Sequence, residues 1–273
     1  MSIGVIGCGL MGKGIIHSLA INGQRVIAVK HHSEDNSFLD YINKELKKKR
    51  ITQEEYERIL ENTSFTVLLE DVADCSIVIE TINEDLEKKC VLFKKLSSIC
   101  GKDTIFASNT SGIPIRLLAE ASDRKEKVIG MHFMSPVSMM KLVEIVKSCY
   151  TSEETFKYAM DLMRSVEKMP VKVNDSPGFV TSRLMASYLC EAIRMVEDET
   201  ADAETIDSIA EVGLGFSMGP LRLADALGLD TALDVMEFLN RELGENFAPG
   251  SLLRDMVKEG KIGKKSGEGF YKY

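Results

Sequence analysis

The sequence predicts an α/β fold in which a doubly wound sheet is followed by an all-helical C-terminal domain. Through the first 175 residues, short apolar runs alternate with stretches whose apolar residues recur at helical spacing. The runs are apolar on both faces, which is typical of parallel strands covered by helices. No further strand pattern follows the turn-forming segment 175–178. We therefore predict one domain over residues 1–175 and a second over residues 176–273.

The elements of the first domain follow from this alternation. A strand is expected at residues 3–6, and a glycine-rich turn leads from it into a helix with Ile15 and Leu19 on one face. Charged helical sequence runs from about residue 34 to residue 60, and further helices are expected over residues 86–96 and 152–166. The remaining strand candidates are residues 26–29, 76–79, 104–107, 128–131, 143–146 and 171–173.

The second domain shows only helical periodicity. Apolar residues at helical spacing mark three helices, and Gly219-Pro220, Gly228 and Pro249-Gly250 interrupt the pattern between or after them. The periodic groups are Leu184, Tyr188, Ala192 and Met195, then Ile206, Ile209 and Ala210, then Ala232, Met236, Leu239 and Leu243.

Composition narrows the function classes. The formal net charge of the 273-residue chain is -8, which disfavours non-specific binding of nucleic acid. No apolar run approaches the roughly 18 residues that a membrane span needs, and the first residues are typical of a strand, not of a signal peptide. The six cysteines form no Cys-x-x-Cys pair, so we expect reduced thiols and a cytoplasmic location. The four histidines lack metal-ligand spacing, and no metal site is predicted.

A glycine-rich element joins the first strand to the first helix. Residues 7–12 read Gly-Cys-Gly-Leu-Met-Gly, which is the pattern G-x-G-x-x-G. Gly7 permits a tight turn, Gly9 lets the backbone approach a pyrophosphate, and Gly12 allows close packing of helix on strand. N–H groups at the helix N-terminus, beginning at Leu10 and Met11, would bind the anion. The strand–turn–helix context therefore predicts a Rossmann domain that binds a dinucleotide.

The residue after the second strand bears on which nicotinamide dinucleotide binds. An acidic residue here accepts hydrogen bonds from the ribose 2′-OH of NAD, but this chain has Lys30, followed by His31, His32 and Ser33. An ammonium group pairs with a 2′-phosphate, so Lys30 favours NADP(H). The alternative is that Lys30 points to solvent and that NAD binds with a weaker ribose contact.

Polar residues in three neighbouring segments suggest the oxidation of an alcohol. Ser111 follows one predicted strand, His132 follows the next, and Glu144 lies in the strand after that. Ligands of open α/β sheets bind at the carboxyl ends of the strands. A histidine can take the hydroxyl proton while hydride leaves the same carbon, and a carboxylate on its other nitrogen fixes the tautomer. Each residue has an alternative interpretation. His132 could be a core residue, Ser111 could belong to an ordinary turn, and Glu144 could be a solvated strand residue.

Eight segments in order along nearly the whole chain carry a family signature. They are VIGCGLMG from Val5, ASNTS from Ala107, GMHF from Gly130, MKLVE from Met140, PGFV from Pro177, MGPL from Met218, GLD from Gly228 and GKKSGEGFY from Gly263. Together they resemble the 3-hydroxyacyl-CoA dehydrogenases, especially the short bacterial 3-hydroxybutyryl-CoA dehydrogenases. The resemblance implies a Rossmann domain, a helical domain that forms a homodimer, and reversible interconversion of (S)-3-hydroxyacyl and 3-oxoacyl thioesters.

The resemblance also assigns roles to individual residues. His132 would be the catalytic acid and base, and Glu144 its orienting partner. Ser111 would contact the substrate oxygen and lie within reach of the cofactor. The positions that match other dinucleotide contacts are Glu84, Lys89 and Lys265.

This chain departs from the family pattern at the predicted site. Lys30 replaces the usual aspartate, Ser135 replaces an asparagine, and Ser182 occupies the place of another asparagine that steadies the substrate. A serine is shorter and offers one donor in place of two, so Ser182 would act on the substrate through a water or accept a differently shaped one.

A basic run is the candidate contact for the CoA nucleotide. It contains Lys47, Lys48, Lys49 and Arg50, whereas Glu45 falls where a small polar residue is expected. The alternative is a solvated helix face. Because an acyl carrier protein is typically acidic, a carrier-bound thioester is an alternative substrate. Two further functions are alternatives to a thioester dehydrogenase. One is a dehydrogenase of another hydroxy acid, and the other is a non-catalytic protein that binds a dinucleotide.

Overall fold

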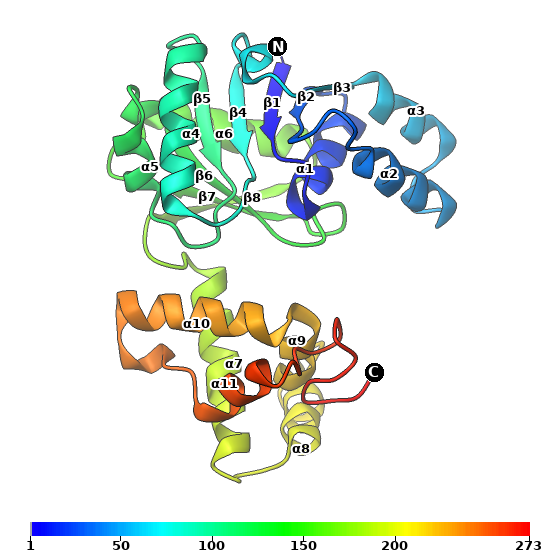
Figure 1. The fold of residues 1–273 in the computed structure, drawn as a ribbon, viewed down its shortest axis with the longest axis vertical. Coiled ribbons are helices and arrows are strands. Elements are labelled where there is room, and N and C mark those ends of the chain that lie inside the picture. Colours follow the sequence, from blue (N-terminus) through cyan, green and yellow to red (C-terminus); the bar gives the residue numbers. More distant parts are fainter. Residues whose placement is uncertain (1) are drawn as a thin grey trace. The chain divides into compact units, whose positions relative to one another are not determined.

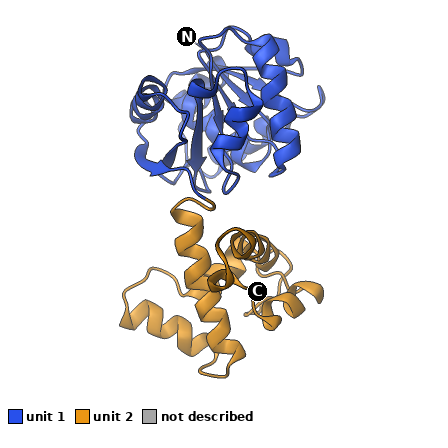
Figure 2. Ribbon diagram, turned by 90° about the vertical axis from the view of Figure 1, so that its left-hand side faces the viewer, with its two compact units in different colours: residues 1–176 blue, residues 177–273 orange. Residues whose placement is uncertain are grey.

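The structure is a computed structural model that describes residues 2–273, with its elements labelled in Figure 1. It divides into two compact units: the first ends at Ser176 and the second covers Pro177–Tyr273 (Figure 2). The predicted boundary lies between residues 175 and 176. Within the described residues, no helix has the length and apolar character needed to cross a membrane.

The first unit is built on an eight-stranded sheet in the order β3-β2-β1-β4-β5-β6-β7-β8. Neighbouring strands from β3 to β6 pair in parallel, and this order is that of a doubly wound dinucleotide-binding fold, so the predicted fold class is confirmed. The strands are β1 (Ser2–Ile6), β2 (Arg25–Val29), β3 (Thr63–Thr66), β4 (Ile77–Glu80), β5 (Ile105–Ser108), β6 (Val128–Phe133), β7 (Leu142–Lys147) and β8 (Met169–Asn174).

Strand β7 corrects the expectation of a wholly parallel sheet. It runs antiparallel to β6, and β8 is parallel to β7. Only the eight residues 134–141 connect β6 to β7, whereas a parallel crossover needs about a dozen or more. Because of the reversal, Glu144 lies within the sheet directly opposite His132, not beyond a carboxyl end.

Six α-helices accompany the sheet, and side-chain caps fix where several begin. Thr52 and Glu55 form a capping box on α3, and Ser152 caps α6. The charged helical stretch expected from about residue 34 to residue 60 forms two helices, α2 and α3, with Lys49 between them at φ 56°. The helices are α1 (Leu10–Ile21), α2 (Ser37–Lys47), α3 (Gln53–Glu61), α4 (Leu86–Ile99), α5 (Ile115–Ala121) and α6 (Glu153–Ser165), with 3₁₀ turns at Leu69–Val72 and Lys125–Lys127.

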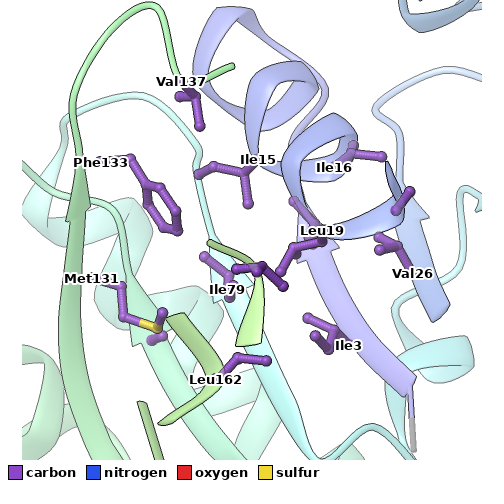
Figure 3. Close-up of a cluster of buried hydrophobic side chains, with 14 of the residues drawn as sticks. Ile3, Ile15, Ile16, Leu19, Val26, Ile79, Met131, Phe133, Val137 and Leu162 are labelled. Atoms are coloured by element: carbon purple, nitrogen blue, oxygen red, sulfur yellow. The ribbon is translucent and has the colours of Figure 1, made fainter. Parts of the chain in front are cut away.

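The main core of the first unit packs α1 and α6 onto the sheet (Figure 3). Ile15 and Leu19 of α1 and Leu162 of α6 belong to one buried cluster with Ile79 and Met131 of the strands. Burial of such a side chain contributes roughly 1.5–3 kcal/mol. This packing holds the ends of β1, β4 and β6, from which the site residues extend.

The second unit is helical, as predicted. Its core includes Leu189, Leu221, Met236, Leu239 and Leu253. The elements are α7 (Thr181–Glu197), α8 (Ala203–Ser208), a π-helical turn (Ile209–Gly213), α9 (Pro220–Leu227), α10 (Leu229–Leu243), a 3₁₀ turn (Glu245–Phe247) and α11 (Ser251–Lys258).

Two buried aspartates hold the end of the chain in the second unit. Asp207 accepts hydrogen bonds from the first N–H groups of α9 and from the Tyr271 hydroxyl. Asp225 accepts from the N–H groups of Phe270 and Tyr271. Both carboxylates are 1% exposed, so these bonds form away from water and fix the C-terminal segment against α9.

Candidate functional site

The glycine-rich loop has the geometry that a dinucleotide requires. Gly7 has φ +101°, and a Cβ on Gly12 would lie 1.9 Å from the Gly7 carbonyl oxygen, so a side chain at either position is strained or excluded. A Cβ on Gly9 would meet nothing within 4 Å, which leaves the outer side of the loop open to a ligand. Gly9 is also the N-cap of α1 and supplies no side-chain cap. The residues present therefore fit a pyrophosphate at this helix N-terminus.

Lys30 follows β2, and its side chain forms hydrogen bonds with the loop that comes directly after it. Its ammonium group donates to the carbonyl oxygens of Ser33 and Asp35, each at 2.8 Å, and lies 5.5 Å from the ring centroid of Phe65. The neighbouring His31 and His32 are exposed, and their rings share a hydrogen bond of 2.7 Å. The position that is often acidic in NAD-binding proteins is thus occupied by a cation held close to its own loop.

His132 and Glu144 form a buried pair across β6 and β7. Nδ1 of His132 lies 2.7 Å from Oε2 of Glu144. The carboxylate is 1% exposed and the histidine 8% exposed. Because the two residues face each other in the antiparallel register, the sheet itself sets their separation. A carboxylate in this position orients the imidazole and stabilises its protonated form.

Ser111 lies in a loop that Glu84 holds. Oε1 of Glu84 accepts from the Ser111 N–H at 3.0 Å, from the Gly112 N–H at 3.3 Å, and from the Thr110 hydroxyl. The side-chain oxygen of Asn109 accepts from the N–H of Phe133 at 3.0 Å. The loop is therefore tied to the residue that follows His132.

Lys89 is buried, whereas a residue that contacts a ligand is expected to be accessible. Its side chain is 1% exposed, and its ammonium group lies 2.6 Å from Glu80 and 3.4 Å from Glu84. A direct contact between Lys89 and the dinucleotide stays a prediction. Sequence reasoning missed Glu80, although an acidic residue directly after the apolar run 76–79 was a visible signal.

The remaining predicted residues lie elsewhere on the chain. Lys47 and Lys48 are exposed at the end of α2, whereas Glu45 is buried and pairs with Arg50 at 3.1 Å. Ser182 is in the first turn of α7, in the second unit. Lys265 belongs to the same unit, with its ammonium group 2.6 Å from Asp230.

The sheet order, the glycine loop and the buried His–Glu pair define the class: a dinucleotide-dependent dehydrogenase with a Rossmann domain and a helical second domain. Two family models cover the chain. The model described as "3-hydroxyacyl-CoA dehydrogenase, NAD binding domain" matches residues 2–176, and the one described as "3-hydroxyacyl-CoA dehydrogenase, C-terminal domain" matches residues 178–273. The chain therefore belongs to the 3-hydroxyacyl-CoA dehydrogenase family, as its motifs indicated.

Similar proteins agree over the full length. The chain is 44% identical to the "Probable 3-hydroxybutyryl-CoA dehydrogenase" of Deinococcus radiodurans, with 100% of both chains covered. It is 38% identical to the 3-hydroxybutyryl-CoA dehydrogenase of Clostridioides difficile, with 100% of this chain and 99% of that one covered. The crystal structure of (S)-3-hydroxybutyryl-CoA dehydrogenase from Ralstonia eutropha matches with a TM-score of 0.94 at 34% identity, covering 100% of this chain and 98% of that one.

Proposed function

We propose that this protein interconverts (S)-3-hydroxybutyryl-CoA and acetoacetyl-CoA with a nicotinamide dinucleotide. The observation that carries the proposal is the buried 2.7 Å contact between His132 and Glu144, set in a Rossmann unit of this family. The relatives from Deinococcus radiodurans and Clostridioides difficile support a short acyl chain, because both are named for the 3-hydroxybutyryl substrate. A non-catalytic role does not explain why a histidine and a carboxylate are paired in this way.

The proposed mechanism assigns the proton to His132. Nδ1–H donates to Glu144, so proton exchange with the substrate oxygen falls to Nε2. Glu144 stabilises the imidazolium that forms when the alcohol is oxidised, and its burial strengthens this interaction. The Ser111 hydroxyl orients the reacting oxygen. When bound, the nicotinamide group accepts the hydride in oxidation and supplies it in reduction.

For the cofactor, we propose that NADP(H) is preferred because of Lys30. Lys30 stands at the position that is often acidic in NAD-binding proteins, and its ammonium group donates to two carbonyl oxygens, which a phosphate can replace. The substitution Lys30→Asp is then expected to shift the ratio of kcat/KM values at least tenfold toward NADH, as roughly 1.4 kcal/mol of lost pairing requires. An unchanged ratio would contradict the role of Lys30.

For the substrate end and the assembly, we propose CoA as the carrier and a homodimer as the working form. The exposed Lys47 and Lys48 supply positive charge for the CoA phosphates. The second unit exposes apolar side chains along one short segment, which supports a contact with a second copy. They are Ile209, Val212, Leu214, Phe216 and Met218.

The test of the activity is the steady-state oxidation of NADPH and NADH by acetoacetyl-CoA at matched concentrations. Turnover is the expected result, and the ratio of the two rates reports the cofactor preference. If neither dinucleotide is oxidised although both bind, acetoacetyl-CoA is not the substrate. A carrier-bound 3-oxoacyl thioester and other hydroxy acids would then be assayed in its place.

A further inference from the structure

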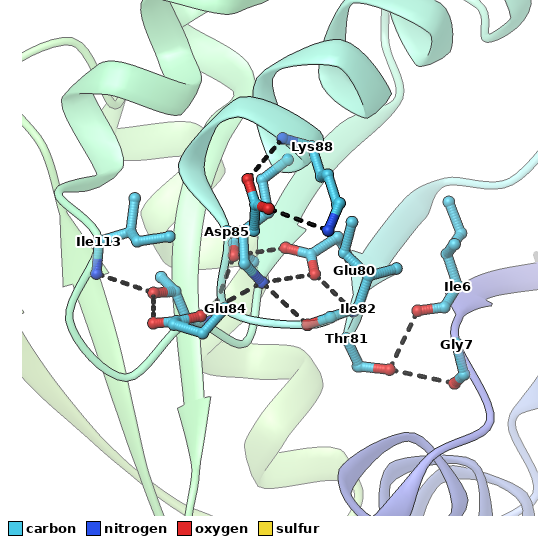
Figure 4. Close-up of polar contacts among 12 residues, drawn as sticks. Ile6, Gly7, Glu80, Thr81, Ile82, Glu84, Asp85, Lys88 and Ile113 are labelled. Atoms are coloured by element: carbon cyan, nitrogen blue, oxygen red, sulfur yellow. Dashed lines mark hydrogen bonds and ion pairs between the residues drawn. The ribbon is translucent and has the colours of Figure 1, made fainter. Parts of the chain in front are cut away.

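Glu80 is a wholly buried carboxylate at the end of β4, beside the proposed site. It is 0% exposed and accepts three hydrogen bonds: from the Lys89 ammonium group at 2.6 Å, the Ser108 hydroxyl at 2.7 Å and the Ile82 N–H at 2.6 Å. Figure 4 labels Glu80 with Ile82 and Glu84. Burial raises the pKa of Glu80, and the Lys89 ammonium group opposes that shift. A buried ion pair of this kind is weak evidence for a purely stabilising role, since apolar residues often serve as well.

One branch from Glu80 runs through Lys89 to Glu84. The ammonium group of Lys89 lies between the two carboxylates, 2.6 Å from Glu80 and 3.4 Å from Glu84. Glu84 is the partly exposed member, and its other oxygen accepts from the Ser111 and Gly112 N–H groups. The position of Glu84, and with it the loop, therefore depends on how Lys89 divides its charge between two partners.

A second branch reaches the same loop through Ser108. The Ser108 hydroxyl donates to Glu80 and accepts from the Thr110 N–H at 3.2 Å. The backbone adds a third link, because the Asn109 N–H donates to the Glu80 carbonyl oxygen at 2.9 Å. All three routes end on residues 109–112, which contain Ser111.

We propose that Glu80 is a positioning residue: through Lys89 and Ser108, its carboxylate sets the geometry of loop 109–112 and so aims Ser111 at the reacting oxygen. The inference rests on the proposed function for the role of Ser111, but the link between Glu80 and the loop is physical and independent of the substrate. Loss of the Glu80 charge leaves Glu84 as the carboxylate that the Lys89 ammonium group contacts. The ammonium group then draws Glu84 from the loop N–H groups.

The test compares Glu80→Gln with a matched control, Glu197→Gln. Glu197 is a carboxylate of the second unit that accepts from the N–H groups of Ser251 and Leu252 and from the Ser251 hydroxyl, so its loss also removes several hydrogen bonds. We expect Glu80→Gln to lower kcat about 30-fold, as misplacement of a reacting group does. The KM for acetoacetyl-CoA should change less than about threefold, because binding elsewhere is retained. The control should keep the wild-type kcat.

A second readout needs no turnover. Hydrogen exchange of a peptide covering residues 109–113 should quicken in Glu80→Gln and remain at the wild-type rate in Glu197→Gln. Glu80→Asp keeps the charge and should recover part of the kcat, and Ser108→Ala tests the other branch if Glu80→Gln fails to fold. An exchange rate that is unchanged in every folded variant overturns the inference, as does an equal loss of kcat in the control. If the wild-type enzyme is inactive but hydrogen exchange still quickens in Glu80→Gln, the proposed function is refuted and the link between Glu80 and the loop stands.

Discussion

His17 is a buried imidazole on α1 whose charge state bears on stability. It is 4% exposed, and its Nδ1 lies 3.0 Å from the Tyr41 hydroxyl. Burial lowers the pKa of His17 below its ordinary value of 6.5, and the nearby Glu45 opposes the shift while Lys168 adds to it. His17, Glu45 and Lys168 line a pocket of about 430 Å³ together with Arg50. The neutral form is therefore the one that the fold accommodates.

This pKa shift predicts a loss of stability in mild acid. The unfolded chain takes up a proton near pH 6.5, and folded His17 takes it up only at lower pH, so the free energy of unfolding falls as pH drops from that value through the folded pKa. Denaturant titrations between pH 7.5 and pH 5 should show a shallower dependence for His17→Gln than for the wild type. Equal pH dependence in the two proteins would contradict the shift.

Single residues also show where prediction from the sequence stops. His132, Glu144 and Ser111 were predicted because their residue types suit the oxidation of an alcohol and because their segments resemble those of a known family. Their roles in the reaction stay predictions. Glu80 was not predicted, because its proposed role depends on contacts with Lys89 and Ser108, which lie 9 and 28 residues away and meet it only in the fold. Burial of a charged group cannot be seen in a sequence, where an acidic residue at a strand end is equally consistent with exposure.

At the scale of elements, two glycines of the glycine-rich loop have different expected roles. Gly12 is expected to be needed for folding, and Gly9 is expected to be needed for ligand binding. A Cβ on Gly12 would strike the Gly7 carbonyl oxygen, whereas one on Gly9 meets no protein atom. Gly12→Ala should therefore cost roughly 1–3 kcal/mol of stability through overpacking. Gly9→Ala should leave the Tm of the free protein unchanged but weaken dinucleotide binding, because the methyl group occupies the ligand's side of the loop.

Thermal unfolding and dinucleotide titration of the two variants check this pair. Each serves as the control for the other. A Gly9→Ala protein that binds the dinucleotide as tightly as the wild type would mean that the pyrophosphate does not approach this part of the backbone.

Most elements were predictable from periodicity, and the exceptions have physical causes. β3 has only one large apolar residue, Phe65, since it is an edge strand with few buried side chains. α5 is short, and its first N–H groups are capped by Asp175, which lies 60 residues away. The direction of β7 depends on the length of the connection from β6, which periodicity does not report.

At the scale of the whole molecule, the exposed apolar segment 209–218 predicts self-association. Val212 is 88% exposed and Leu214 68% exposed. Light scattering after size-exclusion chromatography should give the mass of two chains for the wild type, and Val212→Asp should shift the mass toward one chain. Val67→Asp, at an exposed apolar residue of the first unit, is the matched control and should remain a dimer. A wild-type protein with the mass of one chain at micromolar concentration would contradict the proposed dimer.

The central claim is that His132 exchanges the proton of the reacting oxygen, and His132→Ala tests it most directly. The rate of NAD(P)H oxidation by acetoacetyl-CoA and the Kd of the dinucleotide would be measured on the same preparation. The account predicts that kcat falls roughly 100-fold or more, because general acid–base catalysis is lost, and that the Kd stays at the wild-type value. Undiminished turnover in the variant would contradict the account.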